Sequence, residues 1–154
     1  LCGGALQVDQ RKAEGEAGEP TFAAAISLPA PERAAVLVVD DNADALQLLQ
    51  RYLANSGYMF VGAEDAEQGL ALATELQPKA ILLDVMMPNR DGWSLLGRLR
   101  EHPRTEDIPV VVCTILSQRE LALALGAAGF IRKPVIRADL LQLLDRLTTK
   151  SSHP

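Results

Sequence analysis

The sequence AILLDVMMPNRDG, residues 80–92, decides the fold of this chain. Four apolar residues lead directly into Asp84, and turn-forming residues follow at Pro88 and at Asp91-Gly92. An unbroken apolar run bounded by turn residues predicts a strand that is buried on both faces. Asp84 would then stand at the carboxyl end of that strand, where open α/β sheets bind their ligands. A lone carboxylate there also serves as a helix cap, so its role depends on its neighbours.

Apolar strands and amphipathic helices alternate along the rest of the chain. Further strands are expected at 36–39, 59–61, 110–114 and 130–131. The first helix is expected to begin after a cap at Asp41 or Asn42 and to end at a cap at Gly57. Further helices are expected at 66–76, at 93–101 with Asp91 as the cap, at 118–125 ending at Gly126, and at 136–147. Five strands alternating with five helices predict parallel pairing with right-handed crossovers.

This alternation predicts a doubly wound α/β domain at residues 34–148, with helices on both faces of a five-stranded parallel sheet. Residues 149–154 are expected to form a tail. Residues 1–33 differ in composition and are expected to form an N-terminal extension and linker, because Pro29 and Pro31 stand among small residues. A length of 154 residues suits one domain with an appendage.

Composition excludes several classes of partner. The net charge of −5 and the absence of a Lys/Arg run argue against a nucleic-acid partner. No apolar run is long enough to span a bilayer and no signal peptide opens the chain, so we expect no membrane contact. The two cysteines lack metal-ligand spacing. Cys113 lies in an apolar run, which predicts a small buried side chain in a reducing cytoplasm.

Polar residues stand where the predicted strands end. Asp40-Asp41 follows the first strand, Asp84 the third and Lys133 the fifth, while Thr114 ends the fourth. Each has an ordinary explanation alone, as a cap, a strand former or a surface charge. Parallel strands bring their carboxyl ends to one edge of the sheet, so these side chains are expected to meet there.

Three crowded carboxylates repel one another, and a hard divalent cation relieves this repulsion. Mg²⁺ prefers a few carboxylate oxygens with several waters, so the cluster of Asp40, Asp41 and Asp84 predicts a magnesium site. The metal with Lys133 predicts an incoming anion. A phosphoryl group is the natural candidate, with Thr114 as a further contact and Asp84 as the nucleophile that forms an acyl phosphate.

These residues resemble a known family. The segments VLVVDDN (36–42) and LDVMMP (83–88), together with Asp91-Gly92, Thr114 and Lys133-Pro134, are similar to the receiver domain of two-component response regulators. The intervals agree, although the 19 residues between Thr114 and Lys133 imply a short fourth helix. The resemblance covers about residues 34–148 and implies a flavodoxin-like sheet with the strand order 2-1-3-4-5.

The resemblance also implies roles for the residues of the site. Asp84 would be the phosphoacceptor. Asp41, Asp84 and the main-chain carbonyl of Met86 would bind Mg²⁺, and Asp40 would act mostly through a metal-bound water. No organic cofactor is expected.

Thr114 and Lys133 would contact the phosphoryl oxygens, and the Lys133-Pro134 bond would be cis. Phe130 matches the switch position that responds together with Thr114, although a core aromatic is the plain alternative. Two departures from the family pattern are Ile115, where a small residue is usual, and the pair Asn89-Arg90.

The N-terminal segment carries a second resemblance. Residues 3–8, a charged loop and residues 21–29 are similar to the closing β-hairpin of histidine-kinase ATP-binding domains. The chain would then be the C-terminal receiver of a hybrid histidine kinase, and this part of it is not expected to bind ATP. A disordered tail is the alternative that composition supports equally well.

The sequence therefore predicts a phosphoacceptor module of a phosphorelay. A histidine kinase, a histidine phosphotransfer domain or a kinase domain of the same chain would phosphorylate Asp84, which would remodel a partner-binding face. Its chemistry would be limited to self-phosphorylation and autodephosphorylation, and no DNA-binding output domain is expected after the last helix.

Three other functions are alternatives to this one. One is a receiver-like docking module that is never phosphorylated. A Mg²⁺-dependent phosphohydrolase of the haloacid-dehalogenase type needs Asp-x-Asp after the first strand, where this chain has Asp40-Asp41-Asn42. A flavin or nucleotide site needs a phosphate-binding loop at the same place.

Overall fold

The computed structural model describes residues 33–87 and 92–150, with the backbone alone for Lys150. The predicted kinase hairpin, the Asp91 cap and the pair Asn89-Arg90 lie outside the described residues. The described part of the chain is one compact unit.

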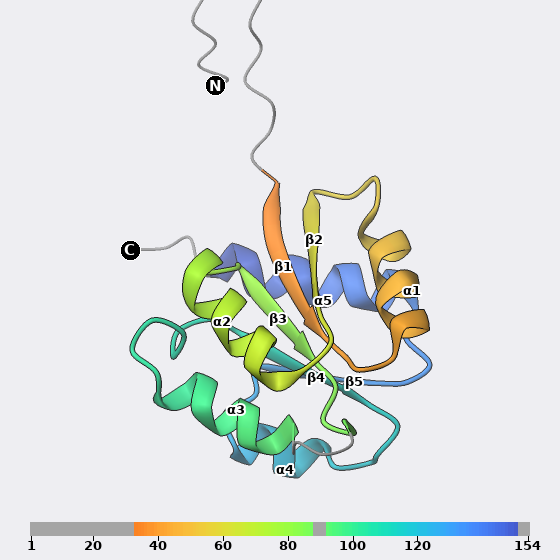
Figure 1. Cartoon of the computed structure of the whole chain (residues 1–154). Coiled ribbons are helices and arrows are strands. Elements are labelled where there is room, and N and C mark those ends of the chain that lie inside the picture. The colour runs from red at the N-terminus through yellow and green to blue at the C-terminus, as the bar shows by residue number, and fades with distance from the viewer. Residues whose placement is uncertain (1–32, 88–91, 151–154) are drawn as a thin grey trace, which may run out of the picture. The chain divides into compact units, whose positions relative to one another are not determined.

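Five parallel strands form one sheet, in the order β2-β1-β3-β4-β5 (Figure 1). The strands are β1 (Ala34–Val39), β2 (Tyr58–Ala63), β3 (Ala80–Leu83), β4 (Val110–Thr114) and β5 (Gly129–Arg132). Every residue of β3 and β4 is buried, as their continuous apolar sequences predict. The predicted flavodoxin-like order is confirmed.

Helices cover both faces of this sheet, which confirms the doubly wound class. They are α1 (Ala43–Leu53), α2 (Ala66–Leu76), α3 (Gly92–Glu101), α4 (Arg119–Ala124) and α5 (Arg137–Lys150). Side chains from α2, α3 and α4 share one core layer with Leu37, Leu83 and Val112, whereas α1 and α5 share the other layer with Val38 and Leu82. The two layers are built mainly of Leu, Val, Ile and Ala, because aromatics are few.

The helix ends follow the predicted caps in part. Asn42 caps α1, since its side-chain oxygen accepts hydrogen bonds from the N–H groups of Asp44 and Ala45. The prediction that Gly57 caps the carboxyl end of α1 is wrong. The helix ends at Leu53, whose carbonyl accepts a hydrogen bond from the Ser56 hydroxyl at 2.6 Å, and Asn55 takes the left-handed backbone with φ 56°.

Several strands and helices extend beyond their predicted bounds; β1 and β5, for example, are longer than 36–39 and 130–131. β2 is longer than 59–61, and α5 continues past 147 to Lys150, so the first residues of the predicted tail are helical. α4 has six residues and ends before Gly126, whose φ of 91° suits glycine, so the short fourth helix is confirmed. The Lys133-Pro134 bond is cis, as the resemblance implied. In the described residues, no helix combines the length and the apolar character needed to cross a membrane.

The Tyr58 hydroxyl joins the start of β2 to α5, and it supports a prediction on stability. It donates a hydrogen bond to Asp145 Oδ1 at 2.6 Å. Burial, and to a smaller extent this hydrogen bond, raises the pKa of Tyr58 above its usual value of 10.0. We expect Tyr58→Phe to lower the free energy of unfolding by about 1–2 kcal/mol near pH 7.

The pH dependence of this loss has a defined sign. A raised pKa in the folded state means that the contribution is complete below pH 10 and disappears as the pH rises through the folded-state value. Urea unfolding of the wild type and Tyr58→Phe from pH 7 to 11 should show their difference shrinking above pH 10. A difference independent of pH would contradict the assignment.

Candidate functional site

The sheet itself positions the carboxylates at its carboxyl edge. The N–H of Asp40 donates to the carbonyl of Ala63 at 3.0 Å, and the N–H of Asp84 donates to the carbonyl of Val39 at 2.9 Å. Both aspartates are therefore held by main-chain bonds directly after the neighbouring strands β1 and β3. The predicted convergence of residues separated by more than 40 positions is present in the structure.

Asp40, Asp41 and Asp84 form one acidic cluster. One carboxylate oxygen from each lies within 4.8 Å of the other two. Asp40 and Asp84 are buried, with 2% and 8% of their surface exposed, whereas Asp41 is exposed. The cluster therefore combines two buried carboxylates with one that is open to solvent.

Lys133 closes the cluster from the end of β5. Its Nζ lies 2.7 Å from Asp40 Oδ2 and 2.6 Å from Asp84 Oδ2, so one ammonium pairs with two buried carboxylates. Burial alone would lower the pKa of Lys133, but the hydrogen bonds and charges of Asp40 and Asp84 together raise it. The lysine is therefore a fixed positive charge at the site.

Main-chain N–H groups fix the rotation of the two buried carboxylates. Asp40 Oδ1 accepts from the N–H of Asn42 at 2.9 Å, and Asp84 Oδ1 accepts from the N–H of Met86 at 2.8 Å. In each case Oδ2 is the oxygen bound to Lys133. Asp84 is thus oriented before any ligand arrives, and its own loop at Met86 helps to hold it.

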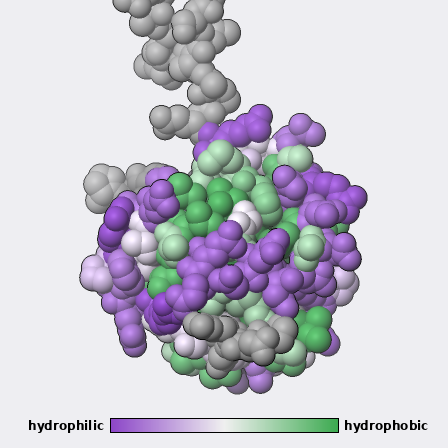
Figure 2. Space-filling model, in the orientation of Figure 1, coloured by the Kyte–Doolittle hydropathy of each residue, from purple (hydrophilic) through white to green (hydrophobic). Residues whose placement is uncertain are grey.

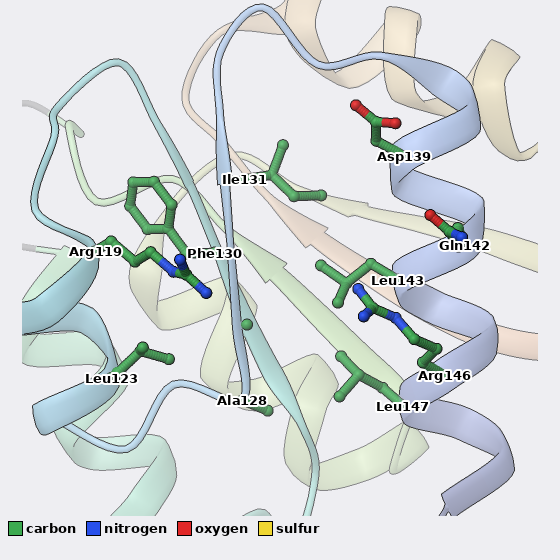
Figure 3. A pocket seen from close by; sticks show the side chains of 11 residues that line it. Arg119, Leu123, Ala128, Phe130, Ile131, Asp139, Gln142, Leu143, Arg146 and Leu147 are labelled. Carbon is green, nitrogen blue, oxygen red and sulfur yellow. The ribbon is translucent and has the colours of Figure 1, made fainter.

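Thr114 and Phe130 occupy neighbouring strands beside this cluster. Thr114 is fully buried, its Oγ1 accepts from the N–H of Leu116 at 3.3 Å, and its carbonyl accepts from the N–H of Lys133 at 3.0 Å. Phe130 is half-buried on the α4 side of β5, and Ile131 points toward α5 (Figure 3).

Phe130 also lines a cavity of about 450 Å³ between α4, β5 and α5.

Cys113, next to Thr114, is fully buried as predicted, and burial raises its pKa to about 12. Its thiol is therefore neutral and belongs to the core.

Gly92 is a residue whose role the sequence did not reveal beyond a turn. A Cβ on Gly92 would lie 2.5 Å from Val85 Cα and 2.6 Å from the carbonyl oxygen of Asp84, both of them main-chain atoms. The first residue of α3 therefore needs glycine because the helix begins against the loop that carries Asp84. The Asp-Gly pair before an apolar helix was the available indication, but it did not identify the close contact.

This contact supports a second prediction. Gly92→Ala should destabilise the fold by about 2 kcal/mol and slow any reaction at Asp84, because main-chain atoms must move to accept the methyl group. Gly97→Ala is a matched control, since nothing lies within 4 Å of a Cβ at that position of α3. Urea unfolding should give Gly97→Ala a free energy of unfolding equal to or higher than that of the wild type. Equal stability of the two variants would contradict the argument.

The chemistry of the donor set fits a hard divalent cation. Mg²⁺ binds oxygen ligands, usually one or two carboxylates with water in the remaining positions. Asp41 is open to solvent and Asp84 retains further lone pairs on both oxygens, so the cluster offers carboxylate oxygens with room for waters. Together with the fixed ammonium of Lys133, the cluster forms an acidic centre on a doubly wound sheet, with oxygen ligands of the kind that Mg²⁺ prefers.

Comparison with known proteins assigns this centre to a family. A model of the response regulator receiver domain matches residues 36–145. The response regulator PleD of Caulobacter vibrioides is 40% identical over 105 residues, which are 66% of this chain and 23% of that protein. The chain therefore belongs to the response regulator receiver domain family and is a receiver module of two-component signalling. It spans about a quarter of the length of PleD.

Solved structures agree with this assignment. The chemotaxis response regulator CheY4 of Vibrio cholerae has a TM-score of 0.69 and 29% identity, covering 74% of this chain and 98% of that one. The receiver domain of the sensor histidine kinase PA1611 from Pseudomonas aeruginosa has a TM-score of 0.69 and 26% identity, covering 75% and 98%. That structure has a magnesium ion coordinated in its active-site cleft.

Proposed function

We propose that Asp84 accepts a phosphoryl group from a phosphohistidine and that Asp41 and Asp84 hold the Mg²⁺ that this transfer needs. The observation that carries the proposal is the ammonium of Lys133 within 2.7 Å of both Asp40 and Asp84 at the edge of the sheet. A fixed cation beside an oriented carboxylate, in a cluster whose third member Asp41 is open to solvent, suits the capture of an anion. The magnesium in the PA1611 receiver supports the choice of metal.

The transfer is a displacement at phosphorus. A carboxylate oxygen of Asp84 forms the new P–O bond while the P–N bond to the donor imidazole breaks, and the imidazole leaves with the bonding pair. Mg²⁺, when bound, neutralises charge on the transferring phosphoryl oxygens. The main-chain carbonyl of Met86 would be a third ligand in this proposal, and Asp40 would act mostly through a metal-bound water. Lys133 exchanges one carboxylate partner for a phosphoryl oxygen.

Thr114 and Phe130 are the proposed link to the surface. A phosphoryl group on Asp84 offers the Thr114 hydroxyl a charged acceptor, and such a bond is stronger than the one it accepts from Leu116. Movement of Thr114 inward leaves space beside β5, and Phe130 turns into it. The face formed by α4, β5 and α5 would change shape in consequence, as a shift between two populated states.

The donor and the setting follow from the same proposal. Receiver domains interact with histidine kinases or phosphotransfer proteins, and the PA1611 receiver is part of a sensor histidine kinase. We propose a cytoplasmic histidine kinase or histidine phosphotransfer domain as the donor, or a kinase domain in the same chain. Residues 1–33 would then be the end of that kinase domain, and residues 34–148 the receiver.

Labelling with a small phosphodonor tests the proposal. Incubation with Mg²⁺ and radiolabelled acetyl phosphate should label the chain, and the label should be released by hydroxylamine, as an acyl phosphate requires. Chelation of the metal with EDTA should abolish labelling, and Ca²⁺ should restore less of it than Mg²⁺ because the two ions prefer different geometries. No label, or a label stable to hydroxylamine, would favour a docking module or another acceptor. Steady hydrolysis of many phosphate esters would favour a phosphohydrolase.

A further inference from the structure

β2 is an edge strand that carries no charge. It pairs with β1 over all six residues, from Ala34 opposite Tyr58 to Val39 opposite Ala63, and within the described part of the chain no strand pairs with its other side. Edge strands are usually protected from pairing by Lys, Pro or a bulge. The sequence of β2 is YMFVGA, which has none of these residues. The other edge strand, β5, contains Arg132.

The side chains beside this edge are apolar or neutral. Met59 is 48% exposed and lies on the α2 side of the sheet, because strand residues alternate and Val61 packs into the core layer of α2. Figure 2 shows hydrophobic surface in the region where Figure 1 places β1, β2 and the adjacent end of α2. On the α1 side, a cavity of about 490 Å³ beside Phe60 is lined by the neutral amides of Gln47 and Gln50, and its one charged lining residue, Glu64, follows the end of the strand.

Charges of opposite sign mark the two ends of this edge. Three exposed basic residues lie at the amino end of the strands. Arg33 directly precedes Ala34, which pairs with Tyr58, and Arg51 lies in the last turn of α1. Lys79 lies just before β3, where its N–H donates to the carbonyl of Ala35 near the start of β1. Glu75 in the last turn of α2 and Asp145, which accepts from the Tyr58 hydroxyl, are acidic residues near this end, and the three basic side chains outnumber these two.

The carboxyl end of the edge is acidic. The exposed residues Glu64 and Asp65 follow β2 directly, and Asp44 lies in the first turn of α1. Along one uncharged strand the chain therefore changes from basic to acidic.

We propose that β2 is the interface of a homodimer, in which the β2 strands of two copies pair antiparallel around a twofold axis. A twofold interface is self-complementary, so each contact is made twice. Pairing centred on Phe60 places Tyr58 of one copy opposite Gly62 of the second copy and Met59 opposite Val61, so that paired side chains share a face of the sheet. The basic end of each copy then lies against the acidic end of the other. A parallel arrangement would place like charges together. The sheet becomes continuous through both copies, and the free N–H and C=O groups of both edges are satisfied.

This interface is separate from the phosphoacceptor site. β1 and β3 lie between β2 and β4, which ends at Thr114, and Lys133 follows β5, so a second copy at β2 leaves the phosphoacceptor site uncovered. The face of α4, β5 and α5 at the opposite edge of the sheet also stays free. Dimerisation through β2 therefore does not depend on phosphorylation, and Asp84→Asn should leave it unchanged.

Sedimentation of the full chain over a range of concentrations tests the proposal. We expect a reversible equilibrium between 16.6 kDa chains and particles of twice that mass. Met59→Lys should weaken association about tenfold, since two charges are added to a symmetric apolar contact. Leu121→Lys on α4, where the leucine is 42% exposed, is the matched control and should not weaken it. A mass of one chain at every concentration, or equal effects of both substitutions, would overturn the proposal.

A charge exchange tests the antiparallel orientation without relying on Met59. Arg33→Glu and Glu64→Arg should each weaken the dimer, and the double variant should recover most of the lost affinity because both end contacts are restored with reversed sign. Failure of the double variant to recover would overturn the proposed pairing. Hydrogen exchange in β2 should slow as concentration rises. Slow exchange of β2 in a monomer would mean that another part of the same chain covers the edge, and would also overturn it.

Discussion

Asp84→Asn is expected to reduce phosphoryl labelling by acetyl phosphate to background. The amide of Asn is a poor nucleophile and cannot form the acyl phosphate, while its shape matches the carboxylate closely enough to keep the loop in place. Its side-chain oxygen can still accept from the N–H of Met86, which now holds Asp84 Oδ1 at 2.8 Å. The substitution therefore removes the chemistry and keeps the local hydrogen bond.

The folded state of this variant should be preserved. Lys133 keeps Asp40 as a partner at 2.7 Å, and the repulsion within the cluster decreases because one of three carboxylates has lost its charge. We expect the free energy of unfolding to stay within about 1 kcal/mol of the wild type. Mg²⁺ should bind more weakly, which a titration followed by Trp93 fluorescence or calorimetry can measure.

Asp41→Asn is the informative companion. Asp41 is the exposed member of the cluster and the proposed metal ligand that does not form the acyl phosphate. Its loss should therefore be overcome in part by raising the Mg²⁺ concentration, whereas the loss of Asp84 should not. Label that persists in Asp84→Asn would mean that a different residue accepts the phosphoryl group.

The sequence predicted the sheet well because its strands are buried on both faces. Runs such as 80–83 and 110–114 admit few interpretations when turn residues bound them, and their alternation with helices leaves parallel pairing as the main solution. Helix ends were less certain because they depend on single side chains. At the end of α1, Ser56 binds the Leu53 carbonyl and Asn55 takes the left-handed backbone, although Gly57 appeared the better cap.

The site was predictable in its composition and less so in its contacts. Strand ends of a parallel sheet must meet, so the convergence of Asp40, Asp84 and Lys133 followed from topology alone. That Lys133 pairs with both carboxylates is a tertiary property, since it depends on the twist of the sheet and the length of the lysine side chain. The need for glycine at position 92 also depends on the folded backbone, because the main-chain atoms that a Cβ would meet are those of Asp84 and Val85, where the chain leaves β3.

Removal of Lys133 should have the largest effect on stability, and the effect should depend on Mg²⁺. Lys133→Met keeps the length of the side chain but leaves the buried carboxylates of Asp40 and Asp84 without their shared cation. An uncompensated buried charge is costly, and we expect a loss of about 3 kcal/mol in the free energy of unfolding without divalent metal. Lys79→Met replaces an exposed lysine and should change stability little.

Saturating Mg²⁺ should restore much of the lost free energy of unfolding. A cation that binds only the folded chain stabilises it, and the gain grows with the logarithm of the ratio of the Mg²⁺ concentration to the dissociation constant. The metal should even bind more tightly to Lys133→Met than to the wild type, since it no longer shares the carboxylates with an ammonium. Phosphoryl labelling should still be slow, because the metal does not replace the positive charge that meets the incoming phosphoryl oxygens. Urea unfolding of the wild type, Lys133→Met and Lys79→Met with and without Mg²⁺ separates these effects. If Mg²⁺ stabilises all three chains equally, Lys133 and the metal do not share the carboxylates of Asp40 and Asp84, and the proposed arrangement of the site is wrong.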